Sequence, residues 1–87
     1  MTAETAENRL KRLKMRSWRR GIKEMDLILG PFSDHALADL SEAELAIYED
    51  LLTENDQDLY QWFSGQIAFP ERYADLGQVI NRHMKPV

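Results

Sequence analysis

The pattern of hydrophobic and polar positions predicts helices along most of the chain. From about residue 7 to residue 18, cations separate apolar residues that recur at near-helical spacing, namely Leu10, Leu13 and Trp18. An apolar stripe opposite charged positions is typical of an amphipathic helix that packs on a core. Met15 lies off this stripe. Residues 1–6 lack such a pattern, and we expect them to form a disordered lead-in.

A second helix is expected to begin at or just after Gly21. Its apolar positions recur about every three or four residues, at Ile22, Met25, Ile28 or Leu29, and Phe32. Gly30 and Pro31 are expected to interrupt or kink this helix. Proline has no amide hydrogen, and its ring clashes with the preceding turn.

Capping residues predict where the third and fourth helices begin. Ser41 and Glu44 have the spacing of a capping box, in which each side chain bonds the other residue's amide. The buried stripe that follows is expected to be Leu45, Tyr48, Leu51 and Leu52. Asn55 is a good N-cap for the fourth helix, and Gly65 is its expected stop. Its inward-facing residues are expected to be Leu59, Trp62 and Phe63.

A fifth helix is expected to begin at Pro70, because the fixed φ of proline suits the first helical position. Its stripe is predicted to be Tyr73, Leu76, Ile80 and His83. The strict alternation that is typical of strands does not occur in the sequence. We therefore predict an all-α fold, a small bundle of five short helices that forms a single domain over residues 1–87.

The charges of the chain are separated along the sequence. Eight of the eleven Lys and Arg residues lie in residues 1–23, whereas residues 24–71 carry twelve carboxylates and no Lys or Arg. A separation of this kind can steer an oppositely charged partner into place. The basic first helix leaves nucleic-acid binding open as an alternative, although the net charge of −4 counts against it.

Composition narrows the class of protein further. The chain has no cysteine, which excludes disulfides, cysteine-based zinc sites and a thiol nucleophile. No apolar run reaches the length of about 18 residues that predicts a membrane-spanning helix. The first seven residues do not resemble a secretory signal, and Glu4 and Glu7 argue against a mitochondrial presequence. We expect a cytoplasmic bacterial protein without membrane insertion.

The junction between the first two helices concentrates the most informative polar residues. Arg20, Gly21 and Glu24 place a cation, a bare backbone position and a carboxylate close together. Arg20 and Glu24 have the spacing of a helical ion pair, but such a pair is worth only about a few tenths of a kcal/mol at the surface. A plain corner between helices is one interpretation. A docking surface for another protein is the other, since arginine can grip a carboxylate with two hydrogen bonds.

The chain shows no catalytic or metal-binding constellation. His35 and His83 stand alone, without carboxylates or cysteines at ligand spacing. Asp56 and Asp58 lack the glycine and the distant glutamate of a calcium loop, and capping of the fourth helix explains them. No glycine-rich phosphate loop is present. We therefore do not expect an enzyme, and we expect no metal site.

Two segments together resemble the SdhE family of FAD assembly factors, also called succinate dehydrogenase assembly factor 2. The first is Arg20-Gly21-x-x-Glu24 followed by residues 25–29, and the second is residues 51–62, which end at Trp62. Members of this family are small factors that help attach FAD covalently to the flavoprotein subunit of succinate dehydrogenase and fumarate reductase. The resemblance implies that this chain does the same.

The resemblance also implies which residues contact the partner. The family's Arg-Gly-x-x-Glu motif is its contact surface, and here the motif falls on Arg20, Gly21 and Glu24. Arg19 and Asp26 also match family positions, and Trp18 lies next to the motif, where it can extend the surface. FAD is the cofactor of the partner, so we expect no tight cofactor binding by this chain.

Two alternative functions would use the same chain differently. An antitoxin-like regulatory module would use the same exposed surface for a different protein partner, and a nucleic-acid-binding module would use the basic first helix. We favour the assembly factor, with no nucleic acid as partner, and we expect the free chain to be a monomer.

Overall fold

The structure is a computed structural model that describes residues 4–83 of the chain. Within these residues it contains α-helices, one short 3-10 helix and no strands. The elements in chain order are α1 (Ala6–Trp18), α2 (Lys23–Ala36), η1 (Leu37–Asp39), α3 (Glu42–Leu51), α4 (Asp56–Phe63) and α5 (Glu71–His83). The predicted all-α bundle of five short helices is confirmed.

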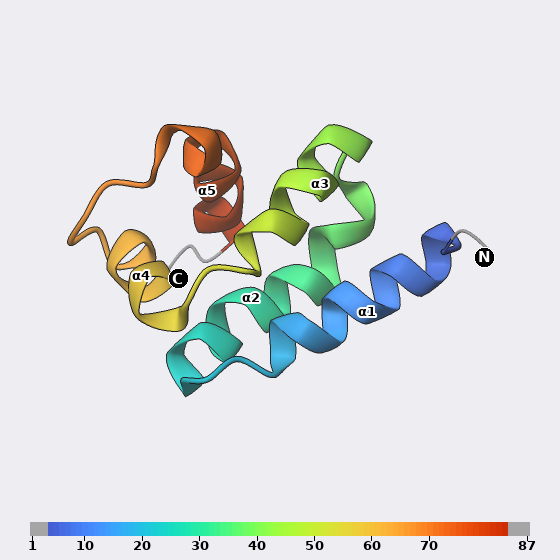
Figure 1. The fold of residues 1–87 in the computed structure, drawn as a ribbon, viewed down its shortest axis with the longest axis horizontal. Helices are drawn as coiled ribbons and strands as arrows, with labels where there is room; N and C mark the ends of the chain where they lie inside the picture. The colour runs from blue at the N-terminus through green and yellow to red at the C-terminus, as the bar shows by residue number, and fades with distance from the viewer. Residues whose placement is uncertain (1–3, 84–87) are drawn as a thin grey trace.

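The first two helices form a hairpin on which the other three pack. Figure 1 shows α1 and α2 side by side and running in opposite directions, joined by a tight corner. Helices α4 and α5 pack against α2, with α4 near the corner, whereas α3 packs against α5 and is bonded to α1. The described part of the molecule is elongated, measuring 42 × 25 × 25 Å. The segment that leads from α3 into α4 lies against the corner.

Helix α1 begins at Ala6 because Thr5 caps it. The Thr5 hydroxyl oxygen accepts a hydrogen bond from the amide of Asn8, at 3.1 Å, which satisfies one of the free amides of the first turn. Of the lead-in that we expected to be disordered, residues 1–3 lie outside the described residues. Residues 4–6 are described, and the helix starts one residue earlier than the apolar pattern suggests.

Helix α2 is not interrupted at Gly30 and Pro31, where we expected an interruption or a kink. It begins at Lys23, two residues after Gly21, and continues through Pro31 to Ala36. Proline removes one backbone hydrogen bond, to the carbonyl of Leu27, which lies on an exposed turn of the helix where water can replace it. Phe32 is buried immediately beyond the proline, so packing holds the helix on both sides of it.

The predicted caps of α3 and α4 are present. The amide of Glu44 donates to Ser41 Oγ at 3.1 Å, and the amide of Ser41 donates to Glu44 Oε1 at 2.9 Å, which completes the capping box. Asn55 Oδ1 accepts from the amide of Asp58 at 2.9 Å. Gly65 follows α4 with φ of +84°, the left-handed conformation that glycine adopts without strain.

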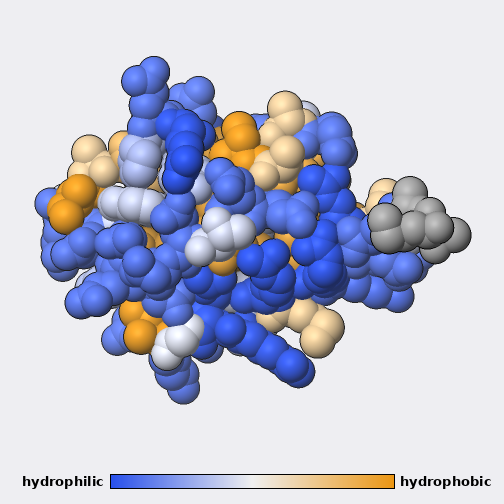
Figure 2. Space-filling view, viewed as in Figure 1, coloured by the Kyte–Doolittle hydropathy of each residue, from blue (hydrophilic) through white to orange (hydrophobic). Residues whose placement is uncertain are grey.

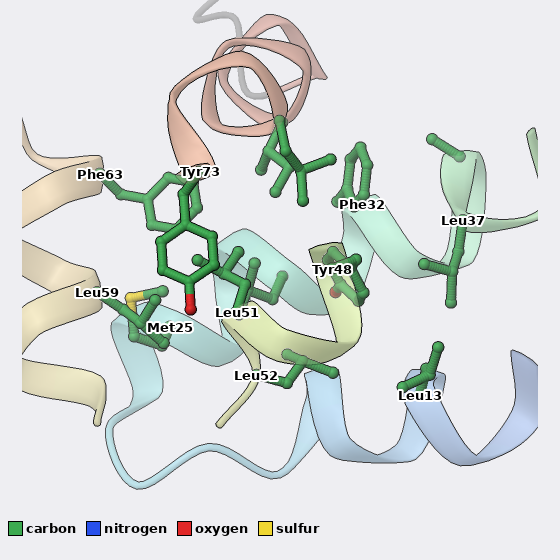
Figure 3. Packing of buried hydrophobic residues seen from close by; sticks show 14 of the residues in the cluster. Leu13, Met25, Phe32, Leu37, Tyr48, Leu51, Leu52, Leu59, Phe63 and Tyr73 are labelled. Carbon is green, nitrogen blue, oxygen red and sulfur yellow. The ribbon is translucent and has the colours of Figure 1, made fainter. Parts of the chain in front are cut away.

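The core lies where the hairpin meets the other helices. Figure 3 shows side chains from all five helices that point toward one another. Most predicted stripe positions are buried, including Leu13, Met25, Tyr48, Leu59 and Tyr73. Three are not as predicted, because Trp18, Ile22 and His83 are exposed. Each of the three lies at an end of its helix, where the stripe runs past the edge of the core.

Candidate functional site

The corner between α1 and α2 is held by the first turn of α2. Arg19 ends α1 with non-helical φ and ψ of −126° and 53°, and Ile22 precedes α2 in an extended conformation. Asp26 Oδ1 accepts a hydrogen bond from the amide of Arg20 at 2.6 Å, so this carboxylate folds the corner back onto its own helix. Asp26 is half-buried, and this hydrogen bond to Arg20 uses its carboxylate within the chain.

Arg20 turns inward and binds the segment between α3 and α4. Its Nε donates to Asp56 Oδ1 at 2.7 Å, and its two terminal nitrogens donate to the carbonyls of Leu52 and Glu54, both at 2.9 Å. The Arg20 side chain is only 10% exposed and that of Asp56 only 14%. A charge pair this sheltered is much stronger than one on the open surface.

This arrangement corrects the expected pairing of Arg20 and adds a second role to Asp56. Arg20 does not lie on a helix with Glu24, because the corner separates it from α2, and its guanidinium pairs with Asp56 instead. Asp56 was explained as a residue of the first turn of α4, which it is, but it also bonds the corner. The sequence offered no signal for this pairing, because the two residues are far apart in the chain.

Gly21 is required by contact within the chain. Its amide donates a hydrogen bond to Asp56 Oδ2, so that one carboxylate binds both Arg20 and Gly21. A Cβ atom at position 21 would lie 2.6 Å from Asp56 Oδ2. Gly21 does not use the positive φ that glycine permits, since in residues 4–83 only Gly65 has one. We name this arrangement of Arg20, Gly21 and Asp56 the clasp.

The exposed side of the corner forms a second group, which we name the docking patch: Arg19, Ile22, Lys23 and Glu24. All four residues are exposed, and none of their side chains makes a hydrogen bond or ion pair within the described part of the chain. A shallow pocket of about 260 Å³ adjoins the patch, lined by Met15, Arg16, Arg19 and Arg20. Cationic, anionic and apolar groups thus lie together on one exposed surface.

Trp18 borders the docking patch and is fixed against α2. Its indole covers the backbone of Gly30, and its Nε1 lies 3.2 Å from both carboxylate oxygens of Asp34. The side chain remains 40% exposed, so one face of it is open to solvent beside the corner. Of the predicted contact residues, Trp18, Arg19, Gly21 and Glu24 are thus exposed, while Arg20 and Asp26 hold the corner.

The opposite charges that are separated along the sequence meet in space. Arg9 bonds Glu42 and Glu49 at 2.6 and 3.3 Å, and Arg12 bonds Glu49 at 2.8 Å, so α1 is tied to α3. The hydrogen bond from Arg12 lowers the pKa of Glu49 below its usual value. The surface in Figure 2 is accordingly mostly hydrophilic, with hydrophobic residues in small separate groups.

Both histidines lie at a second pocket, between α2 and α5. It has a volume of about 320 Å³ and is lined by Leu27, Ile28, Pro31, Phe32, His35 and His83. His35 lies in the last turn of α2, because that helix runs through Pro31. In residues 4–83 no three His, Asp or Glu side chains gather as metal ligands. None of the helices described has the length and apolar composition of a membrane span.

Taken together, the fold and the corner define a small helical domain that presents a charged and partly apolar surface. Comparison with known proteins then places it. The family model described as flavinator of succinate dehydrogenase matches residues 11–84, and the chain belongs to this family.

Three curated relatives show the extent of the similarity. The chain is 38% identical over 80 residues to "succinate dehydrogenase assembly factor 2, mitochondrial" of Drosophila grimshawi, an alignment of 88% of this chain and 54% of that protein. It is 39% identical over 77 residues to the protein of the same name in Meyerozyma guilliermondii, covering 85% and 57%. It is 40% identical over 62 residues to "FAD assembly factor SdhE" of Idiomarina loihiensis, covering 69% of each.

These comparisons confirm the predicted family and contradict the predicted location. The resemblance to the SdhE family is confirmed. The expected location in a bacterial cytoplasm is contradicted, since the fly and yeast relatives are named as mitochondrial and, of the three relatives described, one is bacterial. The prediction relied on the composition of the first seven residues, which is too small a sample to decide a compartment. The chain spans slightly more than half the length of the fly and yeast relatives.

Proposed function

We propose that this chain is an assembly factor that binds the flavoprotein subunit of succinate dehydrogenase, and also that of fumarate reductase, and promotes covalent attachment of FAD. Membership of the flavinator family over residues 11–84 supports this function. The observation that carries it to particular residues is the docking patch, where Arg19, Lys23 and Glu24 are exposed and make no ion pair in the described structure.

The proposed mechanism assigns the chemistry to the partner. The chain acts without being an enzyme itself, and FAD is bound by the flavoprotein rather than tightly by this chain. A monomer of this chain would hold the flavoprotein in the conformer in which its reacting groups are aligned with the flavin. Correct alignment can be worth several kcal/mol of barrier. Such stabilisation requires only that the chain bind this conformer more tightly than the others.

A reconstitution with purified components tests the proposal. Apo-flavoprotein is incubated with FAD, with or without this chain, and then denatured and separated by electrophoresis. Flavin fluorescence in the gel then reports only covalently held flavin. We expect the band to form much faster with the wild-type chain than with FAD alone. Equal rates with and without the chain would refute the proposal.

The structure weighs against the nucleic-acid alternative. Arg9, Arg12 and Lys14, three of the cations of α1, are within 4.0 Å of carboxylates of the chain, which reduces the positive field of the helix. Retention of duplex DNA or RNA on a filter at moderate salt, falling steeply as salt is added, would support that alternative. The antitoxin-like alternative uses the docking patch with another partner, and the reconstitution distinguishes it directly.

A further inference from the structure

The two halves of the Arg-Gly-x-x-Glu segment face in different directions. Glu24 is exposed on the first turn of α2, whereas the guanidinium of Arg20 is sheltered and makes three hydrogen bonds to the α3–α4 segment. Arginine has five N–H donors. Three of these donors are used within the chain and the side chain is only 10% exposed, so at most two donors are left for a partner.

The clasp fixes the corner in space. One carboxylate, that of Asp56, accepts from the side chain of Arg20 and from the amide of Gly21, and Asp26 accepts from the amide of Arg20. The backbone of residues 20 and 21 is therefore tied to two helices, α2 and α4. Ile22, Lys23 and Glu24 follow directly, so their positions depend on this attachment.

From this geometry we propose that Asp56 is a positioning residue for partner docking, and that Arg20 and Gly21 act through it while the docking patch makes the contacts. The inference rests on the proposed function and deepens it, because it divides the motif into two parts. One part holds the corner in place, and the other contacts the partner. It also explains why position 21 is a glycine. The explanation is a contact within the chain, and not the close approach of a partner's backbone. The bare position makes room for the Asp56 carboxylate, which would lie 2.6 Å from an added Cβ atom.

A double-mutant cycle separates these two reasons. The dissociation constant for the purified flavoprotein subunit is measured for the wild type, Gly21→Ala, Asp56→Ala and the double variant. Each single variant is expected to weaken binding by about tenfold or more, since a sheltered charged hydrogen bond is lost. The double variant is expected to bind no more weakly than Asp56→Ala alone, because the clasp is already open and alanine at position 21 then meets nothing.

The control variant is Asp58→Ala. Asp58 is a carboxylate of the same first turn of α4, but its side chain bonds Asn55 and does not reach the corner. We expect its dissociation constant to match that of the wild type within about twofold. Circular dichroism and thermal unfolding confirm that each variant is folded at the temperature of the binding assay. A merely structural role of Asp56 would lower the melting temperature and leave the dissociation constant of the folded protein unchanged.

Each outcome decides the inference. Non-additive losses with an unaffected Asp58→Ala support it. If Gly21→Ala raised the dissociation constant by the same factor in the wild type and in Asp56→Ala, the inference would be overturned, because the partner would then require the bare backbone directly. An unchanged dissociation constant for Asp56→Ala would overturn it as well. Failure of the wild-type chain to bind the flavoprotein would overturn the proposed function, and the inference with it.

Discussion

The indole ring of Trp18, at the end of α1, lies across Gly30 of α2. The ring is so close that a Cβ atom added to Gly30 would overlap it, and Trp18 Nε1 lies 3.2 Å from both oxygens of Asp34, one turn further along α2. Glycine in a helix normally costs about 1 kcal/mol relative to alanine. Here it allows a large aromatic side chain to join the two helices next to the docking patch.

Gly30→Ala is therefore expected to destabilise the protein, although alanine is the better helix former. Overpacking of this kind costs about 1–3 kcal/mol. Equilibrium unfolding in urea, followed by circular dichroism, measures the loss. In a Trp18→Ala background the ring is absent, and we expect Gly30→Ala to raise the free energy of unfolding by up to about 1 kcal/mol. The same loss in both backgrounds would show that the ring is not the cause.

The second prediction concerns a polar pair inside the core. Ser17 Oγ lies 2.8 Å from the carbonyl of Leu13 and 2.5 Å from the hydroxyl of Tyr48, and both Ser17 and Tyr48 are buried. Because the serine hydrogen goes to the carbonyl, the tyrosine hydroxyl donates to the serine. Burial raises the pKa of Tyr48 to about 12, which keeps this donor protonated at neutral pH.

Ser17→Ala is expected to lower the free energy of unfolding by about 1–3 kcal/mol, because it leaves the buried Tyr48 hydroxyl without a partner. Urea unfolding provides the measurement. Tyr48→Phe in the same chain removes the stranded hydroxyl, so the double variant should be more stable than Ser17→Ala alone. A double variant that shows the sum of the two separate losses would contradict this account.

Local chemistry explains which parts of the fold could be predicted. The caps at Ser41 and Asn55 depend on residues three positions away, and the stripes depend on a spacing of three or four, so both are visible in the sequence. The run of α2 through Pro31 could not be predicted, because burial of Phe32 beyond it depends on the tertiary packing. Ser17 was missed for the same reason, since its partner lies on another helix.

The candidate site could be located from the sequence but not resolved into its parts. The motif at residues 20–24 indicated a corner with exposed charges, and Glu24 is exposed there. That Arg20 turns away from the surface follows from Asp56, 36 residues later. Charge alone could not select this partner, because twelve carboxylates lie between residues 24 and 71 and each was a possible partner.

The third prediction is a dependence of stability on pH. Hydrogen bonding to Arg12 lowers the pKa of Glu49 in the folded protein, so the bonds from Arg9 and Arg12 stabilise the fold above the unfolded pKa and are lost as the pH falls through the folded one. Glu49→Gln should therefore lower the free energy of unfolding at about pH 7 by less than about 1 kcal/mol, because the group is partly exposed. The difference should shrink as the pH falls through the folded pKa, towards about pH 2.

Urea unfolding at both pH values measures this dependence. Glu71→Gln is the control, since Glu71 is exposed and makes no ion pair within residues 4–83. Its effect on the free energy of unfolding is expected to be small at both values. Glu49→Gln could instead lower the free energy of unfolding by as much in acid as at neutral pH. That result would mean that the packing of this side chain, rather than its charge, stabilises the fold.

The last prediction separates binding from stability at Glu24. This residue is exposed on the first turn of α2 and makes no hydrogen bond or ion pair in the described structure. Glu24→Ala is therefore expected to change the free energy of unfolding by less than about 0.5 kcal/mol. Binding to the flavoprotein subunit should nevertheless weaken, because the docking patch loses its carboxylate.

Titration calorimetry of each variant with the purified flavoprotein subunit measures this difference, and Glu71→Ala is the matched control. Glu71 is likewise an exposed glutamate in the first turn of a helix, but it belongs to α5 and makes no ion pair within residues 4–83. Both variants lose one negative charge near a helix N-terminus, so net charge and helix dipole change equally. If both weakened binding to the same degree, the effect would come from the overall charge. Weakening by Glu24→Ala alone would place the contact at the corner, where the clasp holds it.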